Sequence, residues 1–411
     1  MKPTVLIATT FRWFPTARLG MALATAGCNV EAVCPPRHPL AKTTVLRQAH
    51  RYRALAPLKS FAAAISSTSP DIVVPCDDLA VLHLHQIYDR ERSRGKQGAV
   101  TCALIERSLG ASANFSVVSD RASLMDAAEE EGIRTPRSKV IGNMGDLREW
   151  TARLGLPLVL KTNGTSGGDG VRIVRTPEQA ERAFRLLQAP PLLARAAKSA
   201  LANRDATSVW PFLLRQQPVV NAQTFIRGRE ATSTVACWEG TVLASLHFEV
   251  VDKRNSTGPA TVLRLISNSD MSTAAEKMVR RLRLSGFYGF DFILEADSGN
   301  AHLIEMNPRA TQVGHLALGP GQDLPAALYA AITGNTIRES PKVTEHDTIA
   351  LFPHEWLRNP TSPFLQSSYH DVPWEEPELI RVCVGTRRKQ EDLYSQQEWV
   401  KAFSPVRLSG R

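Results

Sequence analysis

Apolar and polar residues alternate in two neighbouring segments of the chain, 289–294 and 302–309, which the turn-rich stretch 297–300 connects. Alternation with a period of two is typical of β-strands that are buried on one face. The residues predicted for the buried face are Phe290, Phe292, Leu294, Ile304 and Met306. Because the connection is short and contains glycine and asparagine, the pattern predicts a half-buried antiparallel hairpin.

The other face of this hairpin carries two acids and an amide. A turn centred on Ser298 pairs Asp291 with Glu305 and places Asn307 on the same side as Glu305. Directly opposed Cβ atoms lie about 4.5 to 5.5 Å apart, and like charges there are destabilising unless a cation lies between them. A solvated hairpin with scattered acids is the simpler interpretation, but the apolar opposite face favours one defined acidic face. Oxygen ligands at this spacing suit Mg²⁺, which combines a few carboxylates with phosphate oxygens and water.

A magnesium site of this kind calls for a phosphate-binding segment, and residues 158–174 fit one. An apolar run ends in Lys161, a glycine-rich loop follows, and apolar alternation resumes at Val171. Glycines allow backbone N–H groups to approach a polyphosphate, while a lysine at the end of a strand supplies positive charge. The loop glycines are Gly164, Gly167, Gly168 and Gly170. An ordinary flexible hairpin loop is the alternative, and the segment is neither a Walker A loop nor a dinucleotide fingerprint.

The first hundred residues alternate between short apolar runs and helical patterns. The expected strands are 5–8, 30–33 and 71–75, and the expected helices are 16–26 and 58–66. This order predicts an open parallel sheet, in which ligands bind beyond the carboxyl ends of the strands. Thr9 and Thr10 follow the first strand, and Asp77 and Asp78 follow the third. One of these acids is expected to cap the next helix; a contact to a substrate amino group is the alternative.

Composition fits a globular enzyme with two or three domains. The chain has 411 residues, of which 43% are hydrophobic and 22% charged. No apolar run approaches the roughly 20 residues that span a bilayer, so we expect a cytoplasmic protein without a membrane partner. The formal charge of +9 comes from dispersed basic residues without an aromatic platform, which argues against nucleic acid as a partner. The six cysteines lack paired spacing and are expected to be reduced.

Several motifs stand in one order along the chain. They are Ser119-Asp120-Arg121 before a predicted helix, Lys161 with its glycine loop, the segment 223–230, and the acidic hairpin ending in Asn307-Pro308-Arg309. This ordered set resembles that of the ATP-grasp ligases, most closely the branch that contains carbamoyl-phosphate synthetase and biotin carboxylase. The resemblance is strong over about residues 113–335 and looser over the first hundred.

The resemblance implies a role for the phosphate and metal motifs. Lys161 would contact the ATP phosphates, and Arg309 would neutralise charge on the phosphoryl group during transfer, so both are expected to be catalytic. The lid that closes over the phosphates would comprise Gly164, Thr165, Ser166, Gly167, Gly168 and Gly170. The magnesium ligands would be Asp291, Glu305 and Asn307. The family implies two Mg²⁺ ions, with Mn²⁺ as a substitute.

The same resemblance implies how adenosine binds. The segment with Gln223, Phe225 and Ile226 would read the adenine edge, chiefly through its backbone, and Glu230 would hold the ribose hydroxyls. Family members more often have Glu followed by Lys where this chain has Gln223 and Thr224. Arg121 stands where the family usually has a lysine that contacts the nucleotide.

The fold class that follows is α/β and α+β. An N-terminal open parallel α/β domain, called pre-ATP-grasp in the family, would span 1–112. A two-lobed ATP-grasp module would span 113–340, with a lid subdomain at about 150–226, and the rest, 341–411, would be a C-terminal extension packed on the core. The apolar stretches 351–356 and 371–374 support that packing.

The implied activity is ATP-dependent joining of a small carboxylate and an amine through an acyl phosphate, releasing ADP and phosphate. The alternatives are a carboxylase or carbamoyl-phosphate-forming enzyme that uses bicarbonate, a kinase that stops at the phosphorylated product, and an ATP-binding regulator without catalysis. The family resemblance makes a homodimer the default. His247, Lys253, Arg254 and His315 remain open as substrate contacts or as structural and surface residues.

Overall fold

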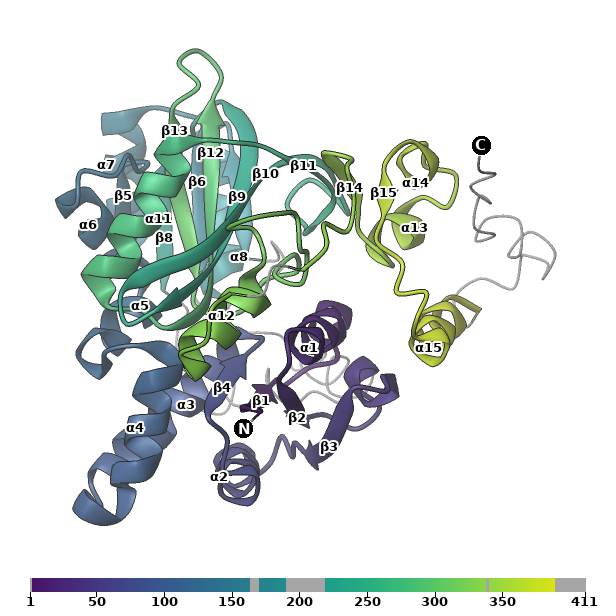
Figure 1. Cartoon of the computed structure of the whole chain (residues 1–411). Helices are drawn as coiled ribbons and strands as arrows, with labels where there is room; N and C mark the ends of the chain where they lie inside the picture. Colours follow the sequence, from purple (N-terminus) through teal and green to yellow (C-terminus); the bar gives the residue numbers. More distant parts are fainter. Residues whose placement is uncertain (1, 163–169, 190–218, 338–339, 389–411) are drawn as a thin grey trace.

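The fold is taken from a computed structural model, which describes residues 2–162, 170–189, 219–337 and 340–388. Three sheets organise it: a parallel sheet at the N-terminus, a small antiparallel sheet and a large sheet of seven strands. Figure 1 shows the large sheet above the N-terminal sheet, with the C-terminal helices to one side. Within the described residues, none of the helices is long and apolar enough to cross a membrane.

The N-terminal sheet is parallel and has the strand order β3-β2-β1-β4. Its strands are β1 (Thr4–Ala8), β2 (Asn29–Cys34), β3 (Leu46–Arg51) and β4 (Ile72–Pro75), and its helices are α1 (Phe14–Thr25), α2 (Pro57–Thr68), α3 (Asp78–Arg92) and α4 (Ala99–Leu109). The predicted parallel α/β unit is confirmed, but the sequence missed β3. That strand lies at the sheet edge and has a mainly exposed, polar face, so it carries no apolar alternation.

Several short helices lie within this part of the chain or lead from it to the next sheet. They are the 3₁₀ turns η1 (Pro39–Lys42), η2 (Gly95–Gly98) and η3 (Ser112–Asn114), and the helices α5 (Phe115–Ser119) and α6 (Arg121–Glu130). Asp120 caps α6, because its carboxylate accepts a hydrogen bond from the N–H of Ser123 at 2.9 Å. This cap fixes Arg121 at the first position of the helix.

The small sheet is antiparallel, in the order β5-β8-β6-β7. Its strands are β5 (Ser138–Ile141), β6 (Leu158–Thr162), β7 (Val171–Val174) and β8 (Val220–Thr224). The helices α7 (Met144–Leu154) and α8 (Pro177–Gln188) cover one face, where apolar residues such as Leu160, Ala222 and Phe184 form a core. The opposite face carries Lys161, Asn221 and Gln223, all of which are buried.

The large sheet has the order β13-β12-β9-β10-β11-β14-β15. Its strands are β9 (Gly228–Trp238), β10 (Thr241–Lys253), β11 (Ala260–Leu265), β12 (Gly286–Glu295), β13 (Ala301–Asn307), β14 (Thr348–Ala350) and β15 (Tyr369–His370). Helices α11 (Ser269–Leu282) and α6 pack on β12 and β13 through one apolar cluster. Helix α12 (Leu324–Thr333) lies between the other side of the sheet and α1, in a core shared with the N-terminal sheet.

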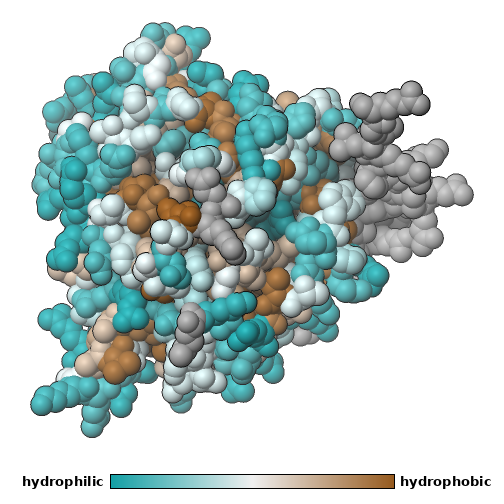
Figure 2. Space-filling model, viewed as in Figure 1, coloured by the Kyte–Doolittle hydropathy of each residue, from teal (hydrophilic) through white to brown (hydrophobic). Residues whose placement is uncertain are grey.

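The C-terminal segment contains α13 (His354–Arg358), α14 (Phe364–Ser367) and α15 (Pro377–Arg388). Leu351, Phe352 and Val372 are buried in the shared core, so these parts of the segment pack on the rest of the chain. Trp374 is the exception, since half of its surface is exposed. Figure 2 shows mainly hydrophilic residues on the face in view, with apolar ones in separate groups.

Candidate active site

The predicted hairpin is formed by β12 and β13, and its register confirms the pairing of Asp291 with Glu305. Asn307 lies on the same side, because its amide Nδ2 donates a hydrogen bond to Asp291 Oδ2 at 2.9 Å. Burial raises the pKa of Asp291, and the neighbouring charge of Glu305 raises it further. Two opposed carboxylates therefore repel each other here, and a cation between them would stabilise both.

One part of the predicted hairpin is wrong. The register shifts by one residue between Asp291 and Phe292, so that Leu303 rather than Ile304 continues the buried face. Ile304 is the extra residue of a β-bulge, which breaks the regular alternation that the sequence suggested. The bulge has a use, since the carbonyl oxygen of Ile304 accepts a hydrogen bond from Lys161 Nζ at 3.2 Å.

Two cations reach this hairpin from neighbouring elements. Lys161 near the end of β6 is almost fully buried, and burial lowers its pKa to about 8 although the charge of Glu305 opposes the shift. Arg121 at the start of α6 donates from Nη1 to Thr162 O at 3.2 Å and from Nη2 to Glu305 Oε1. Lys161 and Arg121 thus join the small sheet and α6 to the acidic hairpin.

The strand, loop and strand predicted around the glycines are confirmed as far as the structure describes them. Strands β6 and β7 pair antiparallel, and the N–H of Thr162 donates to the carbonyl oxygen of Gly170 at 3.1 Å. The predicted lid residues Gly164, Thr165, Ser166, Gly167 and Gly168 lie outside the described residues.

The face of the small sheet opposite α7 and α8 carries several of the residues predicted to bind ATP. By strand register it carries Ser138, Val140, Val159, Lys161, Val171, Ile173, Asn221 and Gln223. Val140 on β5 and Ile173 on β7, the two edge strands of this sheet, are 45% and 42% exposed. Gln223 is buried, and its Nε2 has no hydrogen-bond partner among the described residues. A face that combines apolar side chains with the Gln223 amide suits a planar base with polar edges.

The remaining residues predicted for adenosine lie at the two ends of the connection from β8 to β9. Phe225 and Ile226 follow β8, and the guanidinium of Arg175 lies 5.7 Å from the centroid of the Phe225 ring. Glu230 lies on β9, where its Oε1 accepts a hydrogen bond from Lys253 Nζ at 2.6 Å. Glu230 and Lys253 line a shallow pocket of about 390 Å³.

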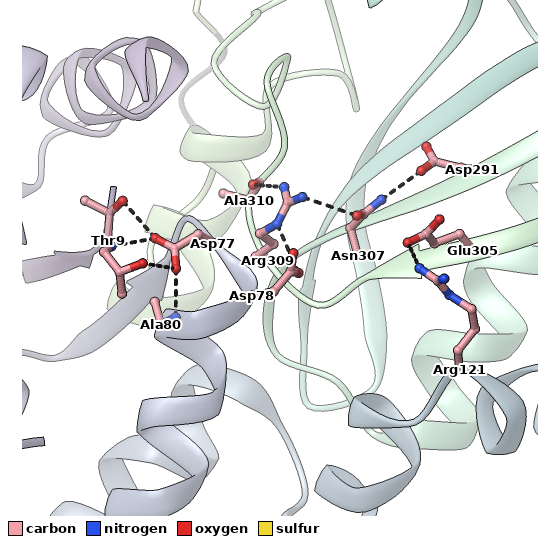
Figure 3. Close-up of polar contacts among 11 residues, drawn as sticks. Thr9, Asp77, Asp78, Ala80, Arg121, Asp291, Glu305, Asn307, Arg309 and Ala310 are labelled. Carbon is pink, nitrogen blue, oxygen red and sulfur yellow. Dashed lines mark hydrogen bonds and ion pairs between the residues drawn. The ribbon is translucent and has the colours of Figure 1, made fainter. Parts of the chain in front are cut away.

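Arg309 lies on the other side of the acidic hairpin, as Figure 3 shows. Its Nη2 donates to Asn307 Oδ1 at 3.4 Å, and its Nε donates to Asp78 Oδ1 at 3.1 Å. The neighbouring Asp77 caps α3 by accepting from the N–H of Ala80 at 2.8 Å, which confirms one of the two helix-capping candidates. The pairing of Asp78 with Arg309 was not predicted, although two acids directly after a strand were the available signal.

Two histidines considered as substrate contacts are engaged by protein groups instead. His247 lies 2.7 Å from Ser233 Oγ and 3.0 Å from Ser272 Oγ, between β9 and α11. His315 lies 2.7 Å from the buried Asp371 in the C-terminal segment. Both contacts favour a structural role for these histidines.

The donor set of the hairpin fits a hard cation. The described residues contain no group of three or more His, Cys, Asp or Glu arranged for a metal, so the candidate ligands are two carboxylates with one amide. All their donor atoms can be oxygens, and burial followed by the charge of Glu305 raises the pKa of Asp291, both of which a bound cation would offset. Asp291, Glu305 and Asn307 therefore suit Mg²⁺ better than a thiolate- or imidazole-seeking metal.

Two kinds of curated protein are similar to this chain in sequence. The carbamoyl phosphate synthase large chain of Rubrobacter xylanophilus is 24% identical over 213 residues, which cover 51% of this chain and 19% of that one. The formate-dependent phosphoribosylglycinamide formyltransferase of Bacteroides fragilis is 23% identical over 261 residues, or 62% of this chain and 58% of that protein. The chain thus spans about a fifth of the synthase large chains that it matches.

Solved structures with the same fold include nucleotide complexes. An N5-carboxyaminoimidazole synthase from Aspergillus clavatus, in complex with ADP and an aminoimidazole ribonucleotide, has a TM-score of 0.58 at 15% identity, covering 82% of this chain and 78% of that one. The biotin carboxylase domain of 2-oxoglutarate carboxylase from Hydrogenobacter thermophilus, in complex with MgADP and bicarbonate, has a TM-score of 0.57 at 15% identity, covering 83% and 71%. At such identities the likeness establishes the fold.

Residues 118–313 match the family profile of the ATP-grasp domain. This range begins just before Arg121 and includes Lys161, Glu230, the acidic hairpin and Arg309. ATP-grasp enzymes use ATP and Mg²⁺, in agreement with the donor set described above. The expected resemblance is confirmed, since residues 118–313 of the chain match an ATP-grasp domain.

Proposed function

We propose that the chain is an ATP-dependent carboxylate–amine ligase that forms an amide or peptide-like bond through an acyl phosphate. The observation that carries the proposal is the opposed pair Asp291 and Glu305, with Lys161 and Arg121 contacting the same hairpin. Opposed acids next to a buried lysine and an arginine match the charges of a nucleotide polyphosphate with its magnesium. Catalysis in ATP-grasp ligases fits this arrangement because phosphoryl transfer needs positioning and charge stabilisation rather than a side-chain nucleophile.

In this proposal the residues divide the work between binding and transfer. Lys161 and Arg121 bind phosphate oxygens, while the face around Gln223 and the following Phe225 and Ile226 bind adenine, and Glu230 binds the ribose. The predicted lid, from Gly164 through Thr165, Ser166, Gly167 and Gly168 to Gly170, covers the phosphates. Asp291, Glu305 and Asn307 hold Mg²⁺, which would offset charge on the phosphates.

Phosphoryl transfer depends on how the Arg309 guanidinium is oriented. A carboxylate oxygen of the substrate attacks the γ-phosphorus while the bond to the β-phosphate bridging oxygen breaks, giving an acyl phosphate and ADP. The amine then attacks the acyl carbon, and phosphate leaves. Arg309 stabilises the charge of the moving phosphoryl group from the side of the hairpin that faces the N-terminal sheet.

Several finer points belong to the same proposal. The chain divides into a pre-ATP-grasp domain at 1–112, an ATP-grasp module at 113–340 with a lid subdomain near 150–226, and a packed extension at 341–411. The separate N-terminal sheet supports the first boundary, whereas β14 and β15 of the extension continue the large sheet of the ATP-grasp module. Two magnesium ions, replaceable by manganese, and a homodimer follow from the family resemblance. A cytoplasmic location agrees with the six unpaired cysteines.

A substrate panel tests the proposal. Purified protein with Mg·ATP is incubated with amino acids and small carboxylates, with bicarbonate, and with each of these plus an amine, and ADP release is measured. We expect release that needs both a carboxylate and an amine, with a ligated product detectable by mass spectrometry. The Glu305→Gln variant serves as the inactive control, so that contaminating ATPase activity is subtracted.

The other outcomes identify the alternatives. Release with one co-substrate and accumulation of a phosphorylated product indicates a kinase, whereas dependence on bicarbonate indicates the carboxylase or carbamoyl-phosphate activity. Binding of Mg·ADP without stimulated release across the whole panel indicates a regulator. Each of these results contradicts the ligase proposal.

A further inference from the structure

We propose that Asp78 and Trp13, from two loops of the N-terminal sheet, are positioning residues that hold Arg309 toward the acidic hairpin. The inference rests on the proposed function, because it gives both residues a part in the same phosphoryl transfer. Neither residue contacts the hairpin acids in the contacts described above, so their effect passes through Arg309.

The contacts of Arg309 divide between two edges of its guanidinium. On one edge, Nε donates to Asp78 Oδ1 at 3.1 Å. Toward the hairpin, Nη2 donates to Asn307 Oδ1 at 3.4 Å, and Asn307 in turn donates to Asp291. The Trp13 ring contributes a cation–π contact, with its centroid 5.6 Å from Arg309 Cζ. Nη1 donates to the carbonyl oxygen of Ala310 at 3.3 Å. Together these contacts fix the plane of the guanidinium with Nη2 toward the metal-ligand face.

The two holding residues are themselves fixed by one buried acid. Trp13 lies immediately before α1, and Asp78 is the first residue of α3. The carboxylate of Asp77, fully enclosed, accepts from the Thr9 hydroxyl at 2.9 Å, from the Thr10 N–H at 2.6 Å, and from the start of α3. Figure 3 shows this cluster next to Arg309. Asp77 thus ties the loop that carries Trp13 to the helix that carries Asp78.

A backbone contact supports the same arrangement. The N–H of Ala310, directly after Arg309, donates to the carbonyl oxygen of Pro75 at 3.1 Å, at the carboxyl end of β4. The backbone and the side chain of this segment are therefore both anchored to the same end of the N-terminal sheet.

The contacts from Asp78 and Trp13 matter because the Arg309 guanidinium has a second position open to it. Asp291 and Glu305 are close enough to attract a long, flexible cation into the position that magnesium should take. Asp78 opposes this attraction from the other side. Since 44% of the Asp78 side chain is exposed, its charge is partly screened, and its main effect is to direct the guanidinium rather than to neutralise it.

The kinetic test uses one disruptive and one conservative variant at each position. Asp78→Asn and Trp13→Leu remove the directing contacts, Asp78→Glu and Trp13→Phe keep a carboxylate and a ring, and Asp89→Asn on the exposed face of α3 is the control. We expect kcat to fall about tenfold or more in Asp78→Asn and in Trp13→Leu, while KM for ATP stays within about twofold of the wild type. Asp78→Glu and Trp13→Phe should keep most of the wild-type rate, and Asp89→Asn should match the wild type. Rates of Asp78→Asn and Trp13→Leu within about twofold of the wild type overturn the inference, as does a parallel loss of Mg·ADP affinity and melting temperature.

A second readout does not need turnover. Phenylglyoxal modifies accessible guanidinium groups, and peptide mapping by mass spectrometry follows Arg309 alone. We expect Asp78→Asn to speed the labelling of Arg309 several-fold relative to wild type and Asp89→Asn, because the guanidinium leaves its fixed place. If no substrate pair supports turnover, the ligase proposal fails and this labelling decides the positioning inference separately. An unchanged labelling rate overturns it.

Discussion

At this site, positively and negatively charged side chains offset one another. Four charged groups, Asp291, Glu305, Lys161 and Arg121, meet where β6, α6 and the hairpin come together. Buried like charges are tolerated only when cations or hydrogen bonds offset them. This balance explains why removing one member should change ligand binding more than it changes folding.

Glu305→Gln or Arg309→Ala should abolish turnover and leave the fold intact. Each change removes a charge that the transition state needs, and we expect kcat to fall by about a hundredfold or more. ADP release and thermal melting are the measurements. Glu295→Gln, at the far end of β12 and bonded to Ser298, is the matched control and should keep its rate. Near-normal rates in either active-site variant would contradict the assigned roles.

Arg121→Ala should have opposite effects on two ligands. Without nucleotide, Arg121 competes with a cation for Glu305, so its loss should tighten binding of Mn²⁺ alone by up to about tenfold. Binding of Mg·ADP should weaken, because a phosphate-binding charge is lost. Electron paramagnetic resonance reports the first affinity and calorimetry the second. If both affinities move in the same direction, Arg121 does not have this double role.

The acidic hairpin shows how far local pattern carries a prediction. Period-two alternation was sufficient to pair Asp291 with Glu305, because side chains in a ladder must alternate. It could not reveal the bulge at Ile304, since one extra residue in a strand leaves no mark in composition. The edge strand β3 was missed for a related reason: a polar edge has no apolar period. The partner of Arg309 was also out of reach, because Asp78 is far away in sequence and chain folding alone brings it close.

The close approach of β12 to the loop after Arg309 offers a test of this element. A Cβ at Gly289 would lie 2.3 Å from Thr311 Cγ2, so no side chain fits there. Gly289→Ala should cost about 1 to 3 kcal/mol of unfolding free energy and reduce activity by displacing the loop. Adding Thr311→Ser removes the clashing methyl group and should restore most of both. Equal losses in the single and the double variant would show that this contact is not the cause.

The C-terminal segment connects distant parts of the chain. Asp371 is buried and accepts from Arg18 on α1, and it also bonds His315 in the loop that follows Arg309. These partners hold the pKa of Asp371 well below its usual range, despite burial that opposes the shift. Asp371 therefore links α1 of the N-terminal part to the loop that follows Arg309.

Asp371→Asn should destabilise the protein by about 3 kcal/mol at neutral pH, because the buried Arg18 loses its close charged partner and keeps only the more exposed Glu375 at 3.6 Å. A depressed carboxyl pKa stabilises the fold above the unfolded value of about 4, and this contribution is lost as the pH falls below that value. The difference in unfolding free energy between wild type and variant should accordingly be constant above about pH 5 and shrink below pH 4. Denaturant unfolding at several pH values measures it, with exposed Asp347→Asn as the control. A pH-independent difference would contradict the charge-based account.

The bulge at Ile304 also separates the two ends of the hairpin. In a regular ladder, one residue gained or lost near the tip would turn every later side chain to the opposite face. Here the strand already contains one unpaired residue between the tip and the acids. Changes of length in the connection between β12 and β13 can be absorbed on the distal side of that residue. The spacing of Asp291 and Glu305 is therefore unaffected by such changes of length in the turn. Natural variants with longer or shorter tips should retain the ligand geometry.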